Sequence, residues 1–418
     1  MTVGGPQAVG VKAHDTSYEW KAVLLLSLGF GLVGLDRFLI VPLFPSIMKD
    51  LDLGYQELGQ ITAILSITWG ISAIFMGRLS DRIGRRRTVV WSTLVFSLLV
   101  GISGLATTFA MLLAVRAIMG LADGAYTPPS ITATLEASKP SRHGLNLGLQ
   151  QAMLPLFGLG LAPIIVTQLL HYIDWRWIFA LLTPPGLIVA YLLHRTLRDP
   201  APEALAQHTA THDISNHSWV DLLKIRNIWL NMIGMLCWLT CMIVMSALLP
   251  SYLVDYLKLD TQSMGFVVSG IGFGAALGTI VIPALSDVIG RKPVMSLSSL
   301  GGVIALVFFI RTGAEPAQLF ALVFMALFFT FGCLNLTVGP LSAESAPAKL
   351  MSTATGMAIL VGEVFGGGVA PIVAGITAER AGIHSILYLA LGAMIIGFLI
   401  SFLLRETAPR RSKAPVAA

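Results

Sequence analysis

Long apolar stretches alternate with short polar segments along almost the whole chain. Each stretch is close to the roughly 20 residues that an α-helix needs to cross the hydrocarbon core of a bilayer. The pattern therefore predicts twelve membrane-spanning helices, six in each half. The predicted spans cover residues 22–45, 58–76, 88–108, 110–135, 144–169 and 176–194, and then 227–251, 262–284, 293–311, 317–340, 353–377 and 384–404.

A longer polar segment, residues 195–226, lies midway along the chain. We interpret it as a linker between two six-helix bundles, residues 22–194 and 227–404, with polar tails at 1–21 and 405–418. Because lipid offers no hydrogen-bond partners, spanning segments must satisfy their backbone groups internally. The expected fold class is therefore an all-α membrane protein with two pseudo-symmetric bundles.

The polar loop between spans 2 and 3 is repeated between spans 8 and 9. The first loop, residues 77–87, reads GRLSDRIGRRR, and the second, residues 284–293, reads ALSDVIGRKP. Among the residues that match at a constant offset of 206 are the pairs Asp81 with Asp287, Gly84 with Gly290 and Arg85 with Arg291. A pattern shared by two halves is typical of transporters built from internal repeats.

We assign the repeated loop to gating rather than to substrate binding. Asp81 can cap a neighbouring helix N-terminus or pair with an arginine across the cytoplasmic face, which would stabilise the outward-open state. The alternative is that the positive charges of the loop only fix the topology. The residues assigned to the gate are Gly77, Asp81, Arg82, Gly84, Arg85, Arg86, Asp287 and Arg291. Glu136 and Glu344, at the ends of spans 4 and 10, are expected in the same latch.

The composition indicates that lipid is the solvent for most of the chain. Hydrophobic residues make up 55% and charged residues 12%, with a mean hydropathy of +0.80, whereas soluble domains carry about twice that charged fraction. A net charge of +5 and a pI near 9.2 could suggest nucleic acid. However, 20 of the 27 Lys and Arg residues lie in the even-numbered loops and the tails. By the positive-inside rule, we expect a protein of the cell (inner) membrane with both termini on the cytoplasmic side. The topology explains the basic pI, so no nucleic-acid partner is needed to account for it.

Other functional classes find little support in the sequence. The three cysteines lie inside apolar stretches and predict neither disulfides nor a metal site. The linker histidines His208, His212 and His217 lack a regular ligand frame, so we expect no metal there. The chain has no phosphate-binding glycine loop after a strand and no nucleophile elbow. We therefore expect neither an enzyme nor a cofactor.

Five ionisable residues lie deep inside predicted spans: Asp36, Arg37, Arg116, Asp123 and Glu363. A charge in the middle of the bilayer costs a few kcal/mol on the more lenient scales, so each should face the bundle interior or a water-filled cavity. Arg116 and Asp123 are seven residues apart on one helix, so they share a face about 10 Å apart along its axis.

This arrangement suits the coupled binding of an anion and a proton. A guanidinium binds a carboxylate through two hydrogen bonds and keeps its charge at any accessible pH. The proton occupancy of a neighbouring acid then depends on whether an anion occupies the arginine. We therefore assign Arg37 and Arg116 to anion binding, and Asp36 and Asp123 to proton coupling. The alternative is that these residues form static ion pairs that hold the spans together.

Three further residues have two interpretations each. Glu363 is the only deep acid of the second half, and it either carries a proton or a second cation, or bonds to Asn335 or to backbone near its glycines. Tyr126 lies three residues after Asp123 and thus near the same helix face. Tyr126 and Asn335 are candidate substrate contacts, with simple packing as the alternative.

The two copies of the S-D-x-x-G-R loop, half a chain apart and each between two spans, resemble the major facilitator superfamily. This resemblance covers nearly all of residues 20–405. It implies twelve helices in two bundles and alternating access, and a single chain that holds both repeats can work as a monomer.

Fewer residues carry a resemblance to one branch, the anion:cation symporters. Asp36-Arg37 in span 1, and Arg116 with Asp123 in span 4, resemble this branch, which moves organic anions such as sugar acids and other carboxylates, usually with protons. The resemblance implies that Arg37 and a glutamine of span 5, Gln150 or Gln151, contact the anion. It also implies that Asp36 and Asp123 take the proton, although the branch more often has Glu at the latter position.

The expected function is therefore a secondary transporter in membrane lipid that moves a small organic anion with protons. The first alternative is a proton-coupled drug or metabolite exporter of the same fold. Such exporters typically carry a proline flanked by glycines in span 5. Pro163 lacks the flanking glycines, which counts against export. Residues 39–47, with two prolines, look like an exporter and count in its favour. A signalling receptor on a transporter scaffold would need a soluble partner-binding domain, for which the linker and the tail are too short.

Overall fold

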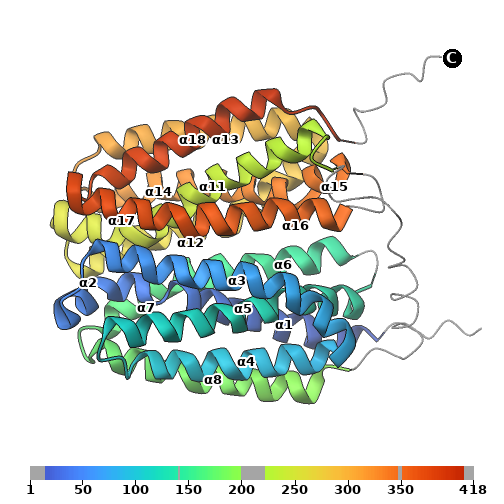
Figure 1. Ribbon diagram of the computed structural model, residues 1–418, viewed down its shortest axis with the longest axis horizontal. Helices are drawn as coiled ribbons and strands as arrows, with labels where there is room; N and C mark the ends of the chain where they lie inside the picture. The colour runs from blue at the N-terminus through green and yellow to red at the C-terminus, as the bar shows by residue number, and fades with distance from the viewer. Residues whose placement is uncertain (1–14, 140–141, 199–221, 347–350, 409–418) are drawn as a thin grey trace, which may run out of the picture.

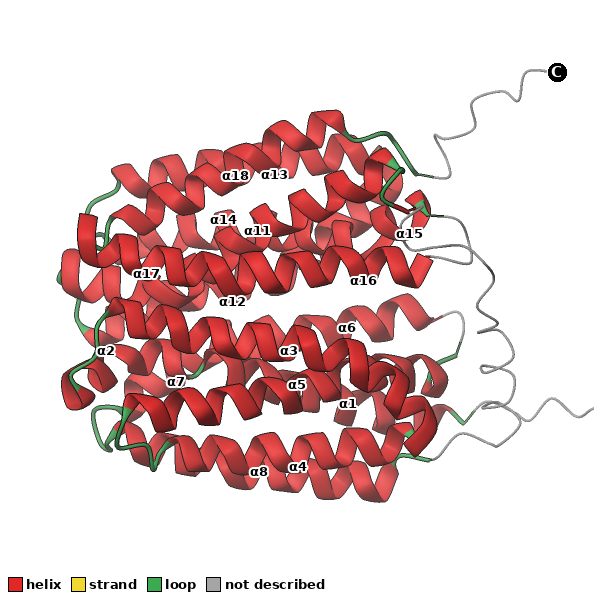
Figure 2. Ribbon diagram, viewed as in Figure 1, coloured by secondary structure: helices red, strands yellow, loops and turns green. Residues whose placement is uncertain are grey.

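The computed structural model describes residues 15–139, 142–198, 222–346 and 351–408. The regular structure of these residues is helical throughout (Figures 1 and 2). Ten helical segments are long and apolar enough to cross a membrane. Two further long helices, α3 (Tyr55–Ile83) and α4 (Arg85–Ser103), occupy the positions of predicted spans 2 and 3. The expected all-α fold with two bundles is confirmed.

The first bundle contains α3, α4 and the helices on either side of them. It begins with α1 (Thr16–Phe38) and α2 (Ile40–Leu51), and after α4 come α5 (Phe109–Ala137), α6 (His143–Pro155), the π-helical segment η2 (Leu156–Leu161), α7 (Ala162–Leu169) and α8 (Trp175–Thr196). Helix α5 packs against α3 and α4, while α1 packs against α6 and η2. The charged span residues of the first half thus meet in this bundle.

The second bundle repeats the arrangement. It consists of α11 (Arg226–Ser251), η3 (Tyr252–Tyr256), α12 (Thr261–Ile289), α13 (Arg291–Arg311), α14 (Pro316–Leu336), η4 (Thr337–Leu341), α15 (Ser342–Ser345), α16 (Met351–Val361), η6 (Gly362–Val369), α17 (Ala370–Ala381) and α18 (Ser385–Leu403). The two bundles meet mainly where α3 packs on η6 and α17, and where α12 packs on α6, η2 and α7.

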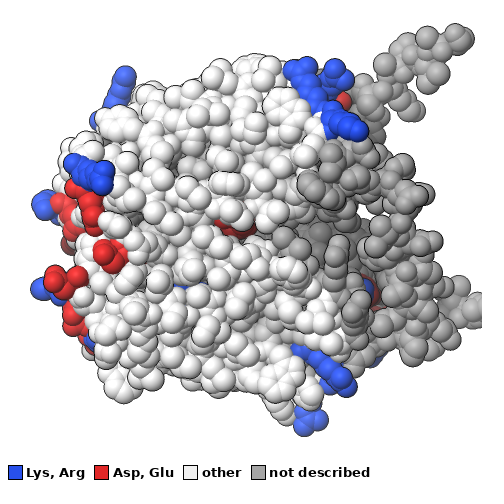
Figure 3. All heavy atoms as spheres, in the orientation of Figure 1, with Lys and Arg blue, Asp and Glu red and all other residues white. Residues whose placement is uncertain are grey.

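Charged side chains gather at the two ends of the molecule, and the surface between them is almost wholly uncharged on the face seen in Figure 3. We call the end at which α1 begins and α8 and α18 end the terminal end; it lies on the right in Figure 1. The other end, with the turns before α3 and after α17, is the opposite end. Large apolar side chains such as Leu121, Phe308 and Leu399 are exposed between the two ends, as a lipid-facing surface requires.

The repeated polar segment is mostly helical, which corrects the prediction of a loop that begins after residue 76. Helix α3 continues to Ile83 and α4 begins at Arg85, so that Gly84 is the residue between them. Gly84 has φ of +98°, and Gly290 between α12 and α13 has φ of +114°. Side chains strongly disfavour this region of φ. A single glycine therefore reverses the chain in each half, and the flanking residues stay helical.

Candidate functional site

An ion pair between Arg37 and Glu363 joins the two bundles in the middle of the membrane. The Arg37 Nη2 donates to Glu363 Oε2 at 3.0 Å, and Nη1 donates to Oε1 at 3.5 Å. The side chains are only 7% and 11% exposed. Arg37 comes from α1 and Glu363 from η6, so the pair links residues 326 positions apart in the sequence. Of the two interpretations of Glu363, neither included this partner.

Two residues of α3 hold the Arg37 guanidinium from the side of the first bundle. Its Nη2 also donates to Ser66 Oγ at 3.0 Å, and its central carbon lies 4.6 Å from the centre of the Trp69 ring. A cation over an aromatic face is attracted by the ring quadrupole. Sequence reasoning missed both residues, although their spacing of three places them on one helix face.

A second charged cluster lies beside this pair, inside the first bundle. Asp36, Arg116 and Asp123 are 5%, 1% and 0% exposed, and they are close enough to interact electrostatically. Arg116 Nη1 donates to the backbone oxygen of Asp36 at 2.6 Å. Arg116 Nε and Nη2, Asp36 Oδ2 and both carboxyl oxygens of Asp123 have no hydrogen-bond partner. Buried polar atoms without partners are costly, so a proton or a polar ligand bound here would lower the free energy.

The two arginines face one small cavity at the bundle interface. The cavity has a volume of about 10 Å³, which is room for about one water molecule. Its wall is otherwise mainly apolar and comes from both bundles: Phe38, Ile40, Val41, Ile61, Thr62 and Leu65 from the first, and Ile243 and Ala247 from the second. The structure thus brings together the predicted residues Asp36, Arg37, Arg116, Asp123 and Glu363.

The other predicted substrate contacts lie elsewhere. Gln150 is fully buried and donates to Ser130 Oγ at 3.1 Å, whereas Gln151 is partly exposed. Tyr126 is also fully buried, and its hydroxyl donates to the backbone oxygen of Leu26 at 2.9 Å. Asn335 donates to Thr279 Oγ1 at 3.1 Å and to the backbone oxygen of Phe331, within the second bundle. These bonds favour packing over substrate contact for Tyr126.

The described gate residues of the first half make contacts within their own bundle. Arg85, at the start of α4, forms an ion pair with Glu136 near the end of α5. Arg86 Nη2 donates to the backbone oxygen of His194, near the end of α8, at 2.5 Å. Gly77, the side chains of Asp81 and Arg82, and the three linker histidines lie outside what the structure describes.

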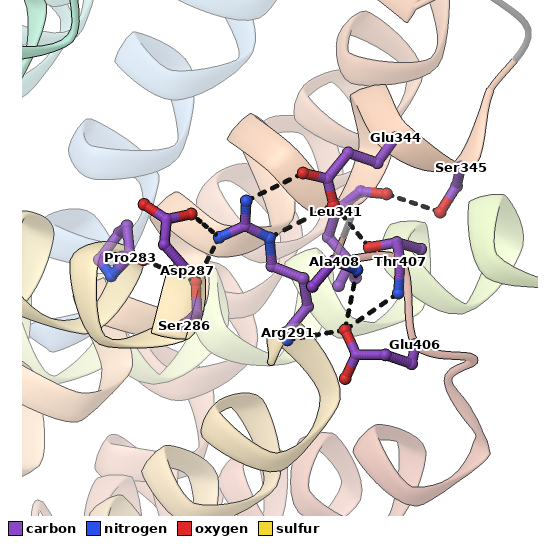
Figure 4. A network of polar contacts seen from close by, with 10 residues as sticks. All are labelled: Pro283, Ser286, Asp287, Arg291, Leu341, Glu344, Ser345, Glu406, Thr407 and Ala408. Atoms are coloured by element: carbon purple, nitrogen blue, oxygen red, sulfur yellow. Dashed lines mark hydrogen bonds and ion pairs between the residues drawn. The ribbon is translucent and has the colours of Figure 1, made fainter. Parts of the chain in front are cut away.

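The equivalent arginine of the second half is the centre of a larger network (Figure 4). Arg291 donates to Asp287 Oδ1 at 2.5 Å and Ser286 Oγ at 2.6 Å, and through Nη2 to Glu344 Oε1 at 2.9 Å. Its backbone N–H donates to Glu406 Oε1 at 2.8 Å. The pairs Arg85–Glu136 and Arg291–Glu344 therefore repeat each other in the two bundles, and each ties neighbouring helices at the terminal end.

The bundles are bonded to each other at the opposite end. Tyr55 donates to Asp255 Oδ2 at 2.5 Å, and the backbone N–H of Gln56 donates to Glu379 Oε1 at 3.0 Å. Gln262 of α12 contacts Gln168 and His171 of the first bundle. Together with Arg37–Glu363, these hydrogen bonds join described residues of the two bundles. These bonds lie mid-membrane or at the opposite end.

A helical protein with an apolar belt, two equivalent bundles and buried charges between them belongs to the class of membrane transporters. The family model described as Major Facilitator Superfamily matches residues 26–367 and 253–418. The chain belongs to this superfamily, and it is a multi-pass membrane protein rather than an enzyme.

Known relatives match most of its length. The sialic acid transporter NanX of Escherichia coli is 26% identical over 403 residues, which cover 90% of this chain and 93% of the relative. The cis,cis-muconate transport protein of Acinetobacter baylyi is 25% identical and covers 91% and 92%. The crystal structure of a bacterial homolog of the human lysosomal transporter Spinster has the same fold, with a TM-score of 0.77, 15% identity and coverage of 93% and 97%.

Proposed function

We propose that this transporter moves a small organic anion together with protons by alternating access. The observation that carries this proposal is the group of buried charges at the bundle interface, in which Arg37 and Arg116 line one cavity beside Asp36 and Asp123. The cavity lies mid-membrane between the two repeats, where substrate sites of such transporters are found.

The arginines favour a carboxylate as the anionic group. The planar fork of a guanidinium matches the two oxygens of a carboxylate, and Arg37 already binds the carboxylate of Glu363 in this manner. Sialic acid and muconate, the substrates named for two relatives, are both carboxylic acids. A sugar acid or another small carboxylate is therefore the substrate class that we propose.

The unpaired acids favour protons as the coupling ion. Both oxygens of Asp123 and one of Asp36 are buried without a hydrogen-bond partner. These oxygens are free to bind a proton, and a bound proton would cancel a charge that is costly to bury. Protons taken up here with the anion would make the carrier a symporter.

The charge distribution supports an orientation with the terminal end in the cytoplasm, since most Lys and Arg residues of the loops and tails belong to that end. The bonds at the opposite end then close the outer side, and the state described would be the inward-facing one. One chain contains both repeats, and we propose that it works as a monomer in the cell membrane.

Uptake into proteoliposomes tests the proposed function. The purified protein is supplied with labelled sialic acid, hexuronates and cis,cis-muconate, with and without an inward proton gradient. We expect gradient-driven accumulation of at least one acid by the wild type. Arg37→Ala should abolish all uptake, whereas Asp123→Asn should abolish accumulation but retain exchange. Arg311→Ala, at an exposed end of α13, is the control and should behave like the wild type.

Two results would count against the proposal. If no organic acid accumulates while cationic or neutral drugs move with the proton gradient, the protein is an exporter. If an acid accumulates equally in wild type and Asp123→Asn, then proton coupling at this residue is wrong.

A further inference from the structure

We propose that Glu363 occupies the place of the substrate's carboxylate on Arg37, and that a bound organic acid displaces it while Glu363 takes up a proton. This inference rests on the proposed function and deepens it. It defines the carboxylate subsite as Arg37, Ser66 and Trp69, and it adds a proton-carrying residue in the second bundle.

The geometry at Arg37 allows one carboxylate at a time. Nη1 and Nη2 both point at the Glu363 carboxylate, at 3.5 and 3.0 Å. A substrate carboxylate that binds the guanidinium end-on needs the same two donors for a bidentate pair. Ser66 and Trp69, by contrast, contact the guanidinium from α3 and do not depend on Glu363. The arginine therefore stays in place when the acid leaves, and it can receive another carboxylate.

The charge balance then requires a proton. The buried pair of Arg37 and Glu363 has no net charge, and the substrate carboxylate that binds Arg37 adds one negative charge. A displaced Glu363 that stayed ionised would be a buried charge without its partner, which is strongly destabilising. If Glu363 binds one proton from water as it leaves Arg37, the site gains one anion and one proton and remains neutral.

The surroundings of Glu363 offer few other charges to replace Arg37. Segment η6 packs against α3, α11, α16 and α17, and α16 carries no titratable residue. The titratable residues of the other three helices are Tyr55, Glu57, Glu379 and Arg380 toward the opposite end, Arg226, Arg78, Asp81 and Arg82 toward the terminal end, and the thiols Cys237 and Cys241. Asp36 and Asp123 are acids that interact with the arginines, and neither can replace Arg37 as a cation. In the middle of the membrane, Arg37 is the cation that holds this acid. Arg116, which lines the same cavity, donates to the backbone oxygen of Asp36 and interacts electrostatically with Asp36 and Asp123.

The displacement also affects how the bundles hold together. Arg37–Glu363 is the mid-membrane bond between them, whereas the other bonds lie at the opposite end. A substrate that binds Arg37 in place of Glu363 breaks this bond. Substrate binding and loosening of the bundle interface are thus one event.

Calorimetric titration of the full chain in lipid nanodiscs tests the inference. Sialic acid and cis,cis-muconate are the probes, and two buffers of different ionisation enthalpy give the number of protons taken up per bound acid. We expect Glu363→Gln to take up one proton fewer than the wild type. The affinity of the wild type should fall as the pH rises, by up to about tenfold per pH unit. Glu363→Gln should lose this pH dependence and bind the acid more tightly than the wild type at alkaline pH.

Two further variants exclude an effect on folding alone. Glu363→Asp keeps the carboxyl but reaches Arg37 less well, so it should take up the full number of protons and bind the acid more tightly. Glu379→Gln removes another acid of the same span that contacts the first bundle, and it should leave the proton number unchanged.

The outcomes separate this inference from the proposed function. If the wild type binds an acid and Glu363→Gln keeps the wild-type proton number and pH dependence, the displacement is wrong and the transport proposal stands. If Glu363→Asp binds the acid no more tightly than the wild type, Glu363 does not compete for Arg37. If the wild type binds no organic acid, both proposals are wrong.

Discussion

Glu406 fixes the chain after the last helix through backbone donors rather than through a cation. Its carboxylate accepts hydrogen bonds from the N–H groups of Arg291, Lys292, Thr407 and Ala408. Burial raises the pKa of this carboxyl, but the bonds from Ala408, Arg291, Lys292 and Thr407 outweigh burial and hold the pKa below its ordinary value of 4.5. The ionised form therefore stabilises the joint between α12, α13 and the C-terminal segment.

This shift predicts a pH-dependent stabilisation. Because the pKa in the folded protein is below 4.5, the stabilisation is fully present above that pH and is lost as the pH falls through the lowered value. The difference in thermal unfolding temperature between the wild type and Glu406→Gln should be present at pH 7 and shrink below about pH 4. Glu315→Gln, at the exposed start of α14, is the control. A difference that is equal at pH 7 and pH 3.5 would contradict the role of ionised Glu406.

Individual site residues were predictable where burial in lipid is expensive. A charge in an apolar stretch is costly and therefore informative, which is why Arg37, Asp123 and Glu363 could be chosen from the sequence. A serine or a tryptophan in such a stretch costs little, so Ser66 and Trp69 gave no signal. The pairing of Arg37 with Glu363 could not be derived either, because no local pattern relates residues 326 positions apart.

Helices α12 and α14 pack through a row of glycines. Gly270, Gly274 and Gly278 are spaced four apart on α12, and each faces a backbone oxygen of α14. A Cβ atom at Gly274 would lie 2.2 Å from the oxygen of Phe324. Small residues at such spacing let membrane helices approach closely. The row thus sets the distance between the two helices.

A larger side chain in this row should separate them. We expect Gly274→Val to destabilise the protein by about 1–3 kcal/mol, the usual cost of overpacking. Gly392→Val on α18 is the matched control, because a Cβ there meets nothing within 4 Å. The measurement is thermal unfolding in detergent. Equal stability of the two variants would mean that α14 can move away from α12 without lowering the stability of the protein.

The existence of the helices was predictable, but their ends were less so. Apolar length located every span, yet α3 extends from Tyr55 to Ile83 where the prediction ended at residue 76. Polar residues after that point favoured a loop, although most of them are compatible with a helix. One glycine of positive φ, Gly84, is enough to reverse the chain, so the connection needs no longer loop.

The two bundles approach each other closely where Gly272 of α12 meets Gly160 of η2. A Cβ atom on Gly272 would lie 1.8 Å from the Gly160 nitrogen. The contact joins backbones of different bundles, so a side chain there would separate the bundles while leaving each bundle's own packing in place. It is therefore a suitable position for shifting the equilibrium between transport states.

We expect Gly272→Leu to disfavour the state that is closed at the opposite end. Spin labels on Leu105 and Gly313, in exposed turns of the two bundles at that end, should report a longer mean distance in Gly272→Leu than in the wild type, measured by double electron–electron resonance. Gly392→Leu serves as the control. An unchanged distance distribution would show that this contact does not control the opening.

How the bundles meet could not be predicted from one sequence. The repeat predicted that two equivalent bundles exist, because the same motif occurs at an offset of 206 residues. Their interface depends on backbone contacts such as Gly272 with Gly160, and on distant pairs such as Tyr55 with Asp255. Neither kind of contact has a local sequence signal. The conformational state of the transporter could therefore be proposed only from the structure.

The π-helical segment η6 has a consequence for comparing this chain with its relatives. A π-helical turn holds one residue more than an α-helical turn, and each residue of an α-helix turns the chain by about 100°. The extra residue in η6 shifts which residues of the span face the first bundle. Glu363, near the start of η6, faces Arg37, and Gly375, beyond the segment, packs on Tyr55 of α3. A relative that lacks one residue in this stretch would present a different position to Arg37. An alignment that places a one-residue gap elsewhere in the span would then pair the acid with the wrong residue.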